Sequence, residues 1–427
     1  MFKIFSTLNA SKRFKYHFIS PLHFAIGTAA EQISVALRFA DLQKKKLIIL
    51  SPYKFLKFEF RVCNNYLFKK LISKNIKKNT DMVSFFFNFI FNIYLLYLAL
   101  INFFLISKIE YPNLGLSLEL LHKNDKIESD DHDYDFSKQS IFLVKNDENI
   151  FFNNLSNHTN YKAQQKIITI HFRDSYYRND ANRSTYRNSS IQNSYKSINY
   201  LLEKGYFVIR VGNIAEEKFE INHNNFFDYS FSKMVSNKND LFLIKNSCFY
   251  IGTNSGLTEV AYLFNVPVLL HNMNLLFEGY PRKKCDRGIL KKIYFGDENK
   301  ELNLFEFMNL PYDYHHSLMH NTELISKINF EENSEDQIFQ AVREYEYLYS
   351  NNSLNQHTLE QDELNRLLIK KINEIYKYNI EKIHKTKMVE KKDLDEPYKN
   401  LRYKNFLNGA ISNIYLINQK KNEKKKI

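Results

Sequence analysis

The chain contains no tryptophan, and it has only 3 cysteines, 7 prolines and 10 glycines among its 427 residues. Cys63, Cys248 and Cys285 lie far apart, so their spacing excludes both a cysteine zinc motif and a disulfide framework. This usage is typical of a reducing compartment. The N-terminus also lacks an uninterrupted apolar signal core, because charged residues break up the apolar ones. We therefore expect a cytoplasmic protein rather than a small secreted scaffold.

What the chain has in excess is positive charge: 60 Lys and Arg stand against 47 Asp and Glu, a formal net charge of +13. Basic residues occur along the whole chain, to a last block at Lys424, Lys425 and Lys426. Such an excess favours anionic partners, namely nucleotide phosphates, acidic lipid or nucleic acid. Nucleic acid is the weakest of these, because no recognised nucleic-acid-binding motif is present. The length and the hydrophobic fraction of 44% predict two domains with real cores.

The first 50 residues predict a β-α-β unit. Residues 16–20 and 47–50 are strand-like apolar runs, and the stretch between them, residues 29–43, has apolar residues at helical spacing. The loop after the first strand of such a unit faces the crevice where parallel sheets bind ligands. His23, Gly27 and Glu31 lie at this loop. His23 is a candidate general base, with a capping or packing histidine as the alternative.

Residues 82–107 form a long uncharged apolar run flanked by lysines. A membrane span needs roughly 20 apolar residues, so the length suffices. A single span, however, would place two parts of one α/β domain on opposite sides of the membrane. Our first interpretation is a helix that contacts a membrane in its plane or re-enters it; a buried core helix and a true span are the alternatives. Asn88, Asn92 and Asn102 argue against a span that faces lipid.

Three predicted strands in the second half end in polar residues of related chemistry. These residues are His171, Arg173 and Asp174, then Arg210, Gly212 and Asn213, then the loop Gly252, Thr253, Asn254, Ser255 and Gly256. Because the carboxyl ends of strands share one edge of a doubly wound sheet, we expect the three groups to converge. Arginine binds phosphate oxygens in a bidentate manner, and a loop that opens a helix adds N–H donors. The sequence thus predicts a diphosphate site, with a structural Arg173–Asp174 pair and an ordinary tight turn as alternatives.

Other polar stretches carry weaker signals. Residues 125–135 are acidic, but nothing at ligand spacing accompanies them, so we expect a solvated loop and no metal site. Residues 146–162 are rich in Asn and are predicted to contain the interdomain linker. The basic loop at 279–284 could contact phosphate, a membrane surface or only solvent. We divide the chain into residues 1–150, 163–325 and a helical, basic extension at 326–427.

Several of these motifs resemble those of a family of bacterial glycosyltransferases that occurs in surface-polysaccharide gene neighbourhoods. The resemblance is good from residue 166 to 268, patchy at both ends and poor across residues 55–141. It rests on His171-Phe172-Arg173-Asp174, Tyr177, Arg187-Asn188, Tyr195, Gly205, Val208-Ile209-Arg210-Val211-Gly212, Asp240-Leu241-Phe242-Leu243, Ile251-Gly252-Thr253-Asn254-Ser255-Gly256-Leu257, Ala410-Ile411-Ser412 and Tyr415-Leu416. The pair His171-x-Arg173 is also similar to the donor-phosphate motif of fucosyltransferases. Asn213 departs from the family, which has Asp at this place.

The resemblance implies the GT-B architecture, in which two Rossmann-like domains face a cleft and the C-terminal one holds a sugar nucleotide. Such enzymes meet the charge on the departing diphosphate with Arg or Lys, backbone N–H groups and a helix dipole rather than a metal. On this basis Arg173 and His23 are the expected catalytic residues, with Gly27 and Glu31 on the acceptor side. The expected donor-binding residues are His171, Asp174, Arg210, Gly212, Gly252, Thr253, Asn254, Ser255, Gly256 and, for ribose hydroxyls, Glu259.

The expected function is transfer of a hexosyl-type sugar, from a nucleotide-sugar of unknown identity to a glycan or lipid-linked acceptor, in surface-polysaccharide biosynthesis. We expect neither a metal nor a cofactor, no nucleic-acid partner, and peripheral contact with the inner face of the plasma membrane. One alternative is a sugar-nucleotide epimerase, which shares the fold and has a Ser-Gly loop followed by a Glu-bearing helix, like Ser255, Gly256 and Glu259. The other is a non-catalytic binding protein at the membrane.

Overall fold

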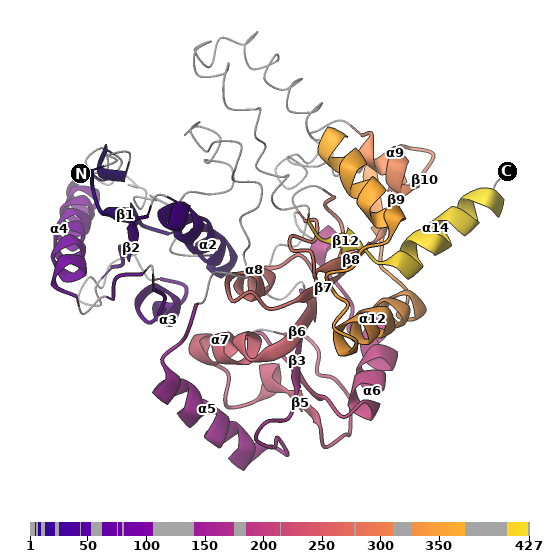
Figure 1. Cartoon of the computed structure of the whole chain (residues 1–427), viewed down its shortest axis with the longest axis horizontal. Helices are drawn as coiled ribbons and strands as arrows, with labels where there is room; N and C mark the ends of the chain where they lie inside the picture. Colours follow the sequence, from indigo (N-terminus) through magenta and orange to yellow (C-terminus); the bar gives the residue numbers. More distant parts are fainter. Residues whose placement is uncertain are drawn as a thin grey trace, which may run out of the picture.

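A seven-stranded parallel sheet forms the centre of the C-terminal half of the computed structural model (Figure 1). Its strands, in spatial order, are β12 (Ala410–Ile411), β8 (Arg287–Leu290), β7 (Val268–Met273), β6 (Ser247–Gly252), β3 (Ile167–His171), β4 (Phe207–Arg210) and β5 (Phe226–Asp228). β3 comes first along the chain; β4 and β5 are added on one side of it, and β6, β7 and β8 on the other. This reversal is the Rossmann-like, doubly wound order, so the predicted α/β class and parallel sheet are confirmed.

The structure describes residues 5, 7–9, 13–21, 25–42, 44–52, 62–74, 76–78, 81–105, 141–174, 185–213, 215–276, 279–310, 314, 326–371 and 408–425. Three predictions lie outside them: the base His23, the acidic loop at 125–135, and Tyr177.

Helices cover both faces of the large sheet (Figure 1). On one side lie α5 (Lys145–His158), α7 (Asn237–Lys245) and α8 (Gly256–Leu263); on the other lie α6 (Tyr195–Glu203) and α12 (Glu335–Ser350). The strands between them are almost continuously apolar and buried, as expected for a parallel sheet covered on both faces. A small antiparallel sheet follows β8 and consists of β10 (Lys300–Leu302), β9 (Lys292–Phe295) and β11 (Ile328–Glu331). The short helix α9 (Leu304–Met308) follows β10.

The N-terminal half contains the predicted β-α-β unit. β1 (Tyr16–Ile19) and β2 (Lys46–Ile49) pair in parallel, and α2 (Ile26–Leu42) connects them. Within the described residues this sheet has two strands, extended by an isolated bridge from Leu47 to Ile76. The short helix α3 (Asn65–Lys69) then packs against α7 of the C-terminal half.

The two faces of β1 and β2 are covered by different helices. One face packs against α4 (Met82–Leu105), in a cluster of Phe18, Ile48, Leu50, Phe91 and Leu95. The other face packs against α2 and belongs to the large core shared with the C-terminal half. Helix α2 is therefore sandwiched between β1 and β2 and the C-terminal domain, where it lies against α8 (Figure 1).

Two predictions about chain organisation require correction. The Asn-rich segment at 146–162, predicted to contain the interdomain linker, is mostly helical: α5 continues through it to His158, buries Phe151 and Leu155, and carries Asp147 and Glu148 in its first turn. Phe151 and Leu155 are four residues apart and so lie on one helix face, which outweighs the weak helix propensity of Asn. The region after residue 326 is more integrated than a helical extension, since α12 packs on the sheet and β12 adds a strand to it. Its last described helix, α14 (Asn413–Lys425), packs against α12.

Candidate active site at the carboxyl edge of the sheet

The switch point of the sheet lies between β3 and β6, because the chain leaves these neighbours in opposite directions. His171 at the end of β3 and Gly252 at the end of β6 are register partners. The first and third predicted groups of polar residues therefore meet side by side. In doubly wound sheets this crevice is the place where ligands bind.

His171 and Ser255 make direct contact across the switch point, with 3.2 Å between Nδ1 and Oγ. Burial, reinforced by the positive charges of Arg210 and Arg173, lowers the pKa of His171 to about 3. The imidazole is thus neutral at pH 7 and can exchange a neutral hydrogen bond but supplies no charge. Gly212 is required beside it: its φ is +120°, and a Cβ there would lie 3.2 Å from Cδ2 of His171.

Ser255 is the N-cap residue of α8, but its side chain makes no capping hydrogen bond. Its hydroxyl lies instead near His171 and, at 3.3 Å, near Oγ1 of Thr258. Thr258 in turn donates to the carbonyl of Thr253, 2.6 Å away. The hydroxyl chain holds the loop at the start of α8, where the helix dipole adds positive potential. The hydroxyl of Thr253 is buried and has no hydrogen-bond partner among the described residues.

Residues outside the loop also hold it in place, through hydrogen bonds to Asn254. Asn254 donates to the carbonyl of Gly279 over 3.0 Å, and its own carbonyl accepts from the Arg187 guanidinium over 2.6 Å. A Cβ at Gly252 would lie 2.7 Å from the Tyr250 ring, so the backbone passes too close to that ring for a larger residue. The loop from residue 252 to 256 is thus rigidly built, which fits pre-organised ligand binding.

Arg173 extends from β3 toward Asn188 and donates a hydrogen bond to its Oδ1. The carbonyl of Asn188 also accepts from Nζ of Lys291, 2.6 Å away. Lys291 directly follows β8 and is buried; burial lowers its pKa, which Glu332, 3.9 Å away, partly restores. The edge therefore carries a second cation that the sequence prediction missed. The signal was weak, because only two apolar residues, Ile289 and Leu290, precede this lysine.

The end of β7 was also missed. His271, Asn272 and Asn274 are all buried there, after the apolar run of that strand. Asn272 exchanges two hydrogen bonds with Asn333, of 2.7 and 2.6 Å, and donates to Ser189 over 2.8 Å. Burial, with the charge of Lys291, lowers the pKa of His271 to about 3. These residues extend the polar edge by one more strand.

Three predicted donor-binding side chains are engaged with protein groups. Arg210 is 1% exposed, with its guanidinium 3.4 Å from the Asp228 carboxylate. Asp174 accepts from the backbone N–H of residue 216. Glu259 forms a bidentate pair with Arg282, with N–O distances of 2.5 and 2.6 Å. In this structure Arg210 and Glu259 are therefore engaged in ion pairs, and Asp174 in a hydrogen bond to the backbone.

Two predicted acceptor-side residues, Gly27 and Glu31, lie next to the loop at 252–256 or to the helix that follows it. Gly27, in the first turn of α2, crosses Gly256, the first residue of α8, so closely that a Cβ on Gly27 would lie 2.6 Å from the Gly256 Cα. Burial by itself would lower the pKa of Arg282, but Glu259 and then Glu31, one turn further along α2, outweigh it and raise that pKa. Helices from the two halves of the chain thus share one charge cluster.

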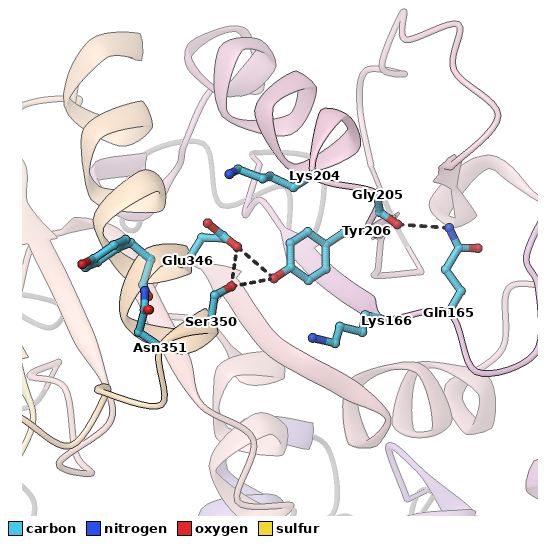
Figure 2. A pocket seen from close by; sticks show the side chains of 9 residues that line it. Gln165, Lys166, Lys204, Gly205, Tyr206, Glu346, Ser350 and Asn351 are labelled. Atoms are coloured by element: carbon cyan, nitrogen blue, oxygen red, sulfur yellow. Dashed lines mark hydrogen bonds between the residues drawn. The ribbon is translucent and has the colours of Figure 1, made fainter.

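The opposite edge of the sheet holds a polar cavity of about 570 Å³ (Figure 2). Lys166 and Tyr206, which precede β3 and β4, line it together with Glu346 of α12. Tyr206 and Ser350 both donate to the Glu346 carboxylate, over 3.0 and 2.6 Å, so this carboxylate joins α12 to the sheet. The cavity lies at the amino ends of the strands, away from the switch point.

Among the residues that the structure describes, no three His, Cys, Asp or Glu side chains are grouped so that they could hold a metal ion.

No family model and no curated protein matches the chain. It is similar to two solved structures of a glycosyltransferase, TibC. The dodecameric iron-containing heptosyltransferase TibC in complex with ADP-D-β-D-heptose shares 15% identity over 45% of this chain and 47% of that one, with a TM-score of 0.24. The dodecameric iron-containing glycosyltransferase TibC from enterotoxigenic E. coli H10407 shares 13% identity over 47% and 50%, with a TM-score of 0.26. This chain thus spans about half of each, and the Rossmann-like assignment rests on the strand order alone.

Proposed function

We propose that the chain transfers a sugar, of hexosyl type, from a nucleotide-sugar donor to a glycan or lipid-linked acceptor in surface-polysaccharide biosynthesis, without a metal. The observation that carries the proposal is the contact between His171 and Ser255 at the switch point, beneath the start of α8 and beside Arg173. Neutral donors, a helix N-terminus and a cation at one edge suit a diphosphate.

The roles follow from the charge state of each group. Arg173 supplies the positive charge that meets the departing diphosphate, and Lys291 reinforces it from the end of β8. His171, with its pKa lowered to about 3, contributes a hydrogen bond rather than a charge. Arg210 is too deeply buried to contact a ligand and adds only a long-range potential. The acceptor would approach from the side of α2, near Gly27 and Glu31.

Donor binding is the first test. A thermal-shift panel of UDP-, GDP-, CMP- and dTDP-sugars should show stabilisation by one base, because a ligand that binds only the folded state raises its stability. The Arg173→Ala variant should weaken that binding roughly 10- to 100-fold, the magnitude of one charge-assisted hydrogen bond. Arg343→Ala, an exposed arginine on α12, is the matched control and should bind like wild type. No shift with any of the four donors would contradict the proposal.

Transfer itself is tested by NMR. The donor that binds best is incubated with and without membrane extract as a source of acceptor, in the presence and absence of EDTA. Transfer that needs the acceptor and survives EDTA is the expected result. Interconversion of the sugar without an acceptor would identify an epimerase instead. Full complementation of a glycan defect by Arg173→Ala would indicate a binding protein whose phosphate clamp is not used.

A further inference from the structure

Helix α4 is apolar on its outward face as well as its buried one, where Phe91 and Leu95 pack against β1 and β2. Its buried face also carries the polar residues Ser84, Asn88 and Asn92. Its outward face is apolar, with exposed fractions from 42% to 87%, and consists of Met82, Phe85, Phe86, Phe89, Ile93, Leu96, Tyr97 and Leu100. We call this set the α4 outer face. A continuous apolar strip of this length on a protein surface marks a site of association.

The buried face fixes α4 to the N-terminal sheet. The Asn88 side chain accepts from the backbone N–H of Ser51 over 2.9 Å, and Asn92 donates to the carbonyl of Ser51 over 3.0 Å. The two asparagines thus provide hydrogen-bond partners for both the N–H and the carbonyl of Ser51, just beyond β2. Of the described helices, α4 alone is long and apolar enough to cross a membrane. Spanning, however, would strip these asparagines from their partners and expose them to lipid.

The N-terminal part of the chain that contains α4 is strongly basic. Residues 1–105 contain 16 Lys and Arg but only 4 Asp and Glu, a net charge of +12 out of +13 for the whole chain. Among the described residues of this segment, the exposed cations are Arg13, Lys15, Lys44, Lys46, Lys70, Lys74 and Lys78. Helix α4 itself carries no charge, and it lies on the side of β1 and β2 away from the large sheet (Figure 1).

We propose that the α4 outer face docks on an anionic lipid bilayer, with the helix axis in the membrane plane. The apolar side chains enter the acyl boundary and the cations contact anionic headgroups, as in interfacial helices. A second copy is a poorer occupant, because pairing these faces would bring two units of charge +12 together. The inference does not depend on sugar transfer, and its test measures lipid binding alone.

The absence of tryptophan gives a direct measurement of depth, because one introduced indole reports alone. Phe86→Trp and Leu100→Trp place the probe at two points of the outer face, about 21 Å apart along the helix. Tyr347→Trp, an exposed site on α12, is the control. Each full-length variant is mixed with vesicles of phosphatidylcholine alone or with phosphatidylglycerol, including lipids brominated at shallow or deep acyl positions.

With anionic vesicles, we expect the fluorescence of both α4 probes to shift to the blue and to be quenched equally by shallow bromines. Vesicles of phosphatidylcholine alone should produce neither effect, and Tyr347→Trp should respond to neither kind of vesicle. Lys74→Glu with Lys78→Glu should reduce binding at least tenfold, as should high salt. Three outcomes would overturn the proposal. Stronger quenching by deep than by shallow bromines of a third probe, Ile93→Trp at the middle of the helix, would indicate a span, because only a spanning helix places its middle at the bilayer centre. No quenching would exclude lipid contact. A dimer in light scattering that dissociates in Phe86→Gln would assign the face to a second copy.

Discussion

Gly27 and Gly256 form a backbone contact between the two halves of the chain: a Cβ on Gly27 would lie 2.6 Å from the Cα of Gly256, and one on Gly256 would lie 3.2 Å from the Gly27 nitrogen. The first turns of α2 and α8 thus meet backbone to backbone at these two glycines. The contact places the expected acceptor side, on α2, directly against the loop at 252–256, the expected donor side.

Gly27→Ala should therefore destabilise the protein. Alanine is favoured over glycine by up to about 1 kcal/mol in helix propensity, but overpacking costs about 1–3 kcal/mol. The clash here is with backbone atoms, which cannot change rotamer to relieve it. We expect a net loss of about 1–2 kcal/mol in urea unfolding, and weaker donor binding. Ser34→Ala, a half-buried position on the same helix, should cost little. Equal stabilities for the two variants would mean that the helices separate freely.

Arg282 and Glu259 should show strong coupling in a double-mutant cycle. Their side chains are only 12% and 19% exposed, and the guanidinium also lies over the Tyr262 ring. Removing either partner leaves a largely buried charge, so we expect a coupling free energy of about 1–3 kcal/mol. The exposed pair Lys300–Glu306 is the control, with an expected coupling below about 0.5 kcal/mol. Comparable coupling in the two cycles would show that Arg282 is free to leave Glu259.

Asp240 should make stability depend on pH. Burial raises the pKa of its carboxyl from 3.8 to about 7, although the N–H of Gly212, 3.2 Å away, limits the rise. The folded state therefore keeps this proton to higher pH than the unfolded state does. Its stabilising contribution is complete below pH 3.8 and is lost as the pH rises toward 7.

Asp240→Asn should remove this dependence, since Asn keeps the acceptor for Gly212 and cannot ionise. The free energy of unfolding of the variant should rise relative to wild type between pH 4 and 7, by at most about 1.4 kcal/mol per pH unit. The exposed Asp336→Asn is the control and should show no such trend. A flat difference for Asp240→Asn would place its folded pKa near the ordinary value.

Asn88→Leu tests whether α4 belongs to the fold. The substitution leaves the backbone N–H of Ser51 buried without its acceptor, which should cost about 1–3 kcal/mol. Phe89→Leu, the next residue and 49% exposed, should change stability little. Chemical unfolding followed by circular dichroism measures both. A neutral Asn88→Leu would show that α4 is not anchored through its asparagines.

The order of elements could be predicted from sequence because its signals are local. Apolar runs such as Ile167–Ile170 and the helical period after Ala29 depend on neighbours a few residues away. The same reasoning placed His171 and the loop at 252–256 at strand ends. It was less successful at 146–162, where the many asparagines suggested a linker. Most of this segment is instead the helix α5, which buries two apolar residues on one face.

The sequence by itself determined the alternation of strands and helices, the polar residues at the strand ends, and the uncharged run that became α4. Only the tertiary structure decided which of those residues face the crevice. It buried Arg210 against Asp228, paired Glu259 with Arg282, and brought Lys291 to Asn188, 103 residues away in the chain. The reason is physical: periodicity depends on neighbours along the chain, whereas the partner of a charge depends on chain crossings such as that of Gly27 and Gly256.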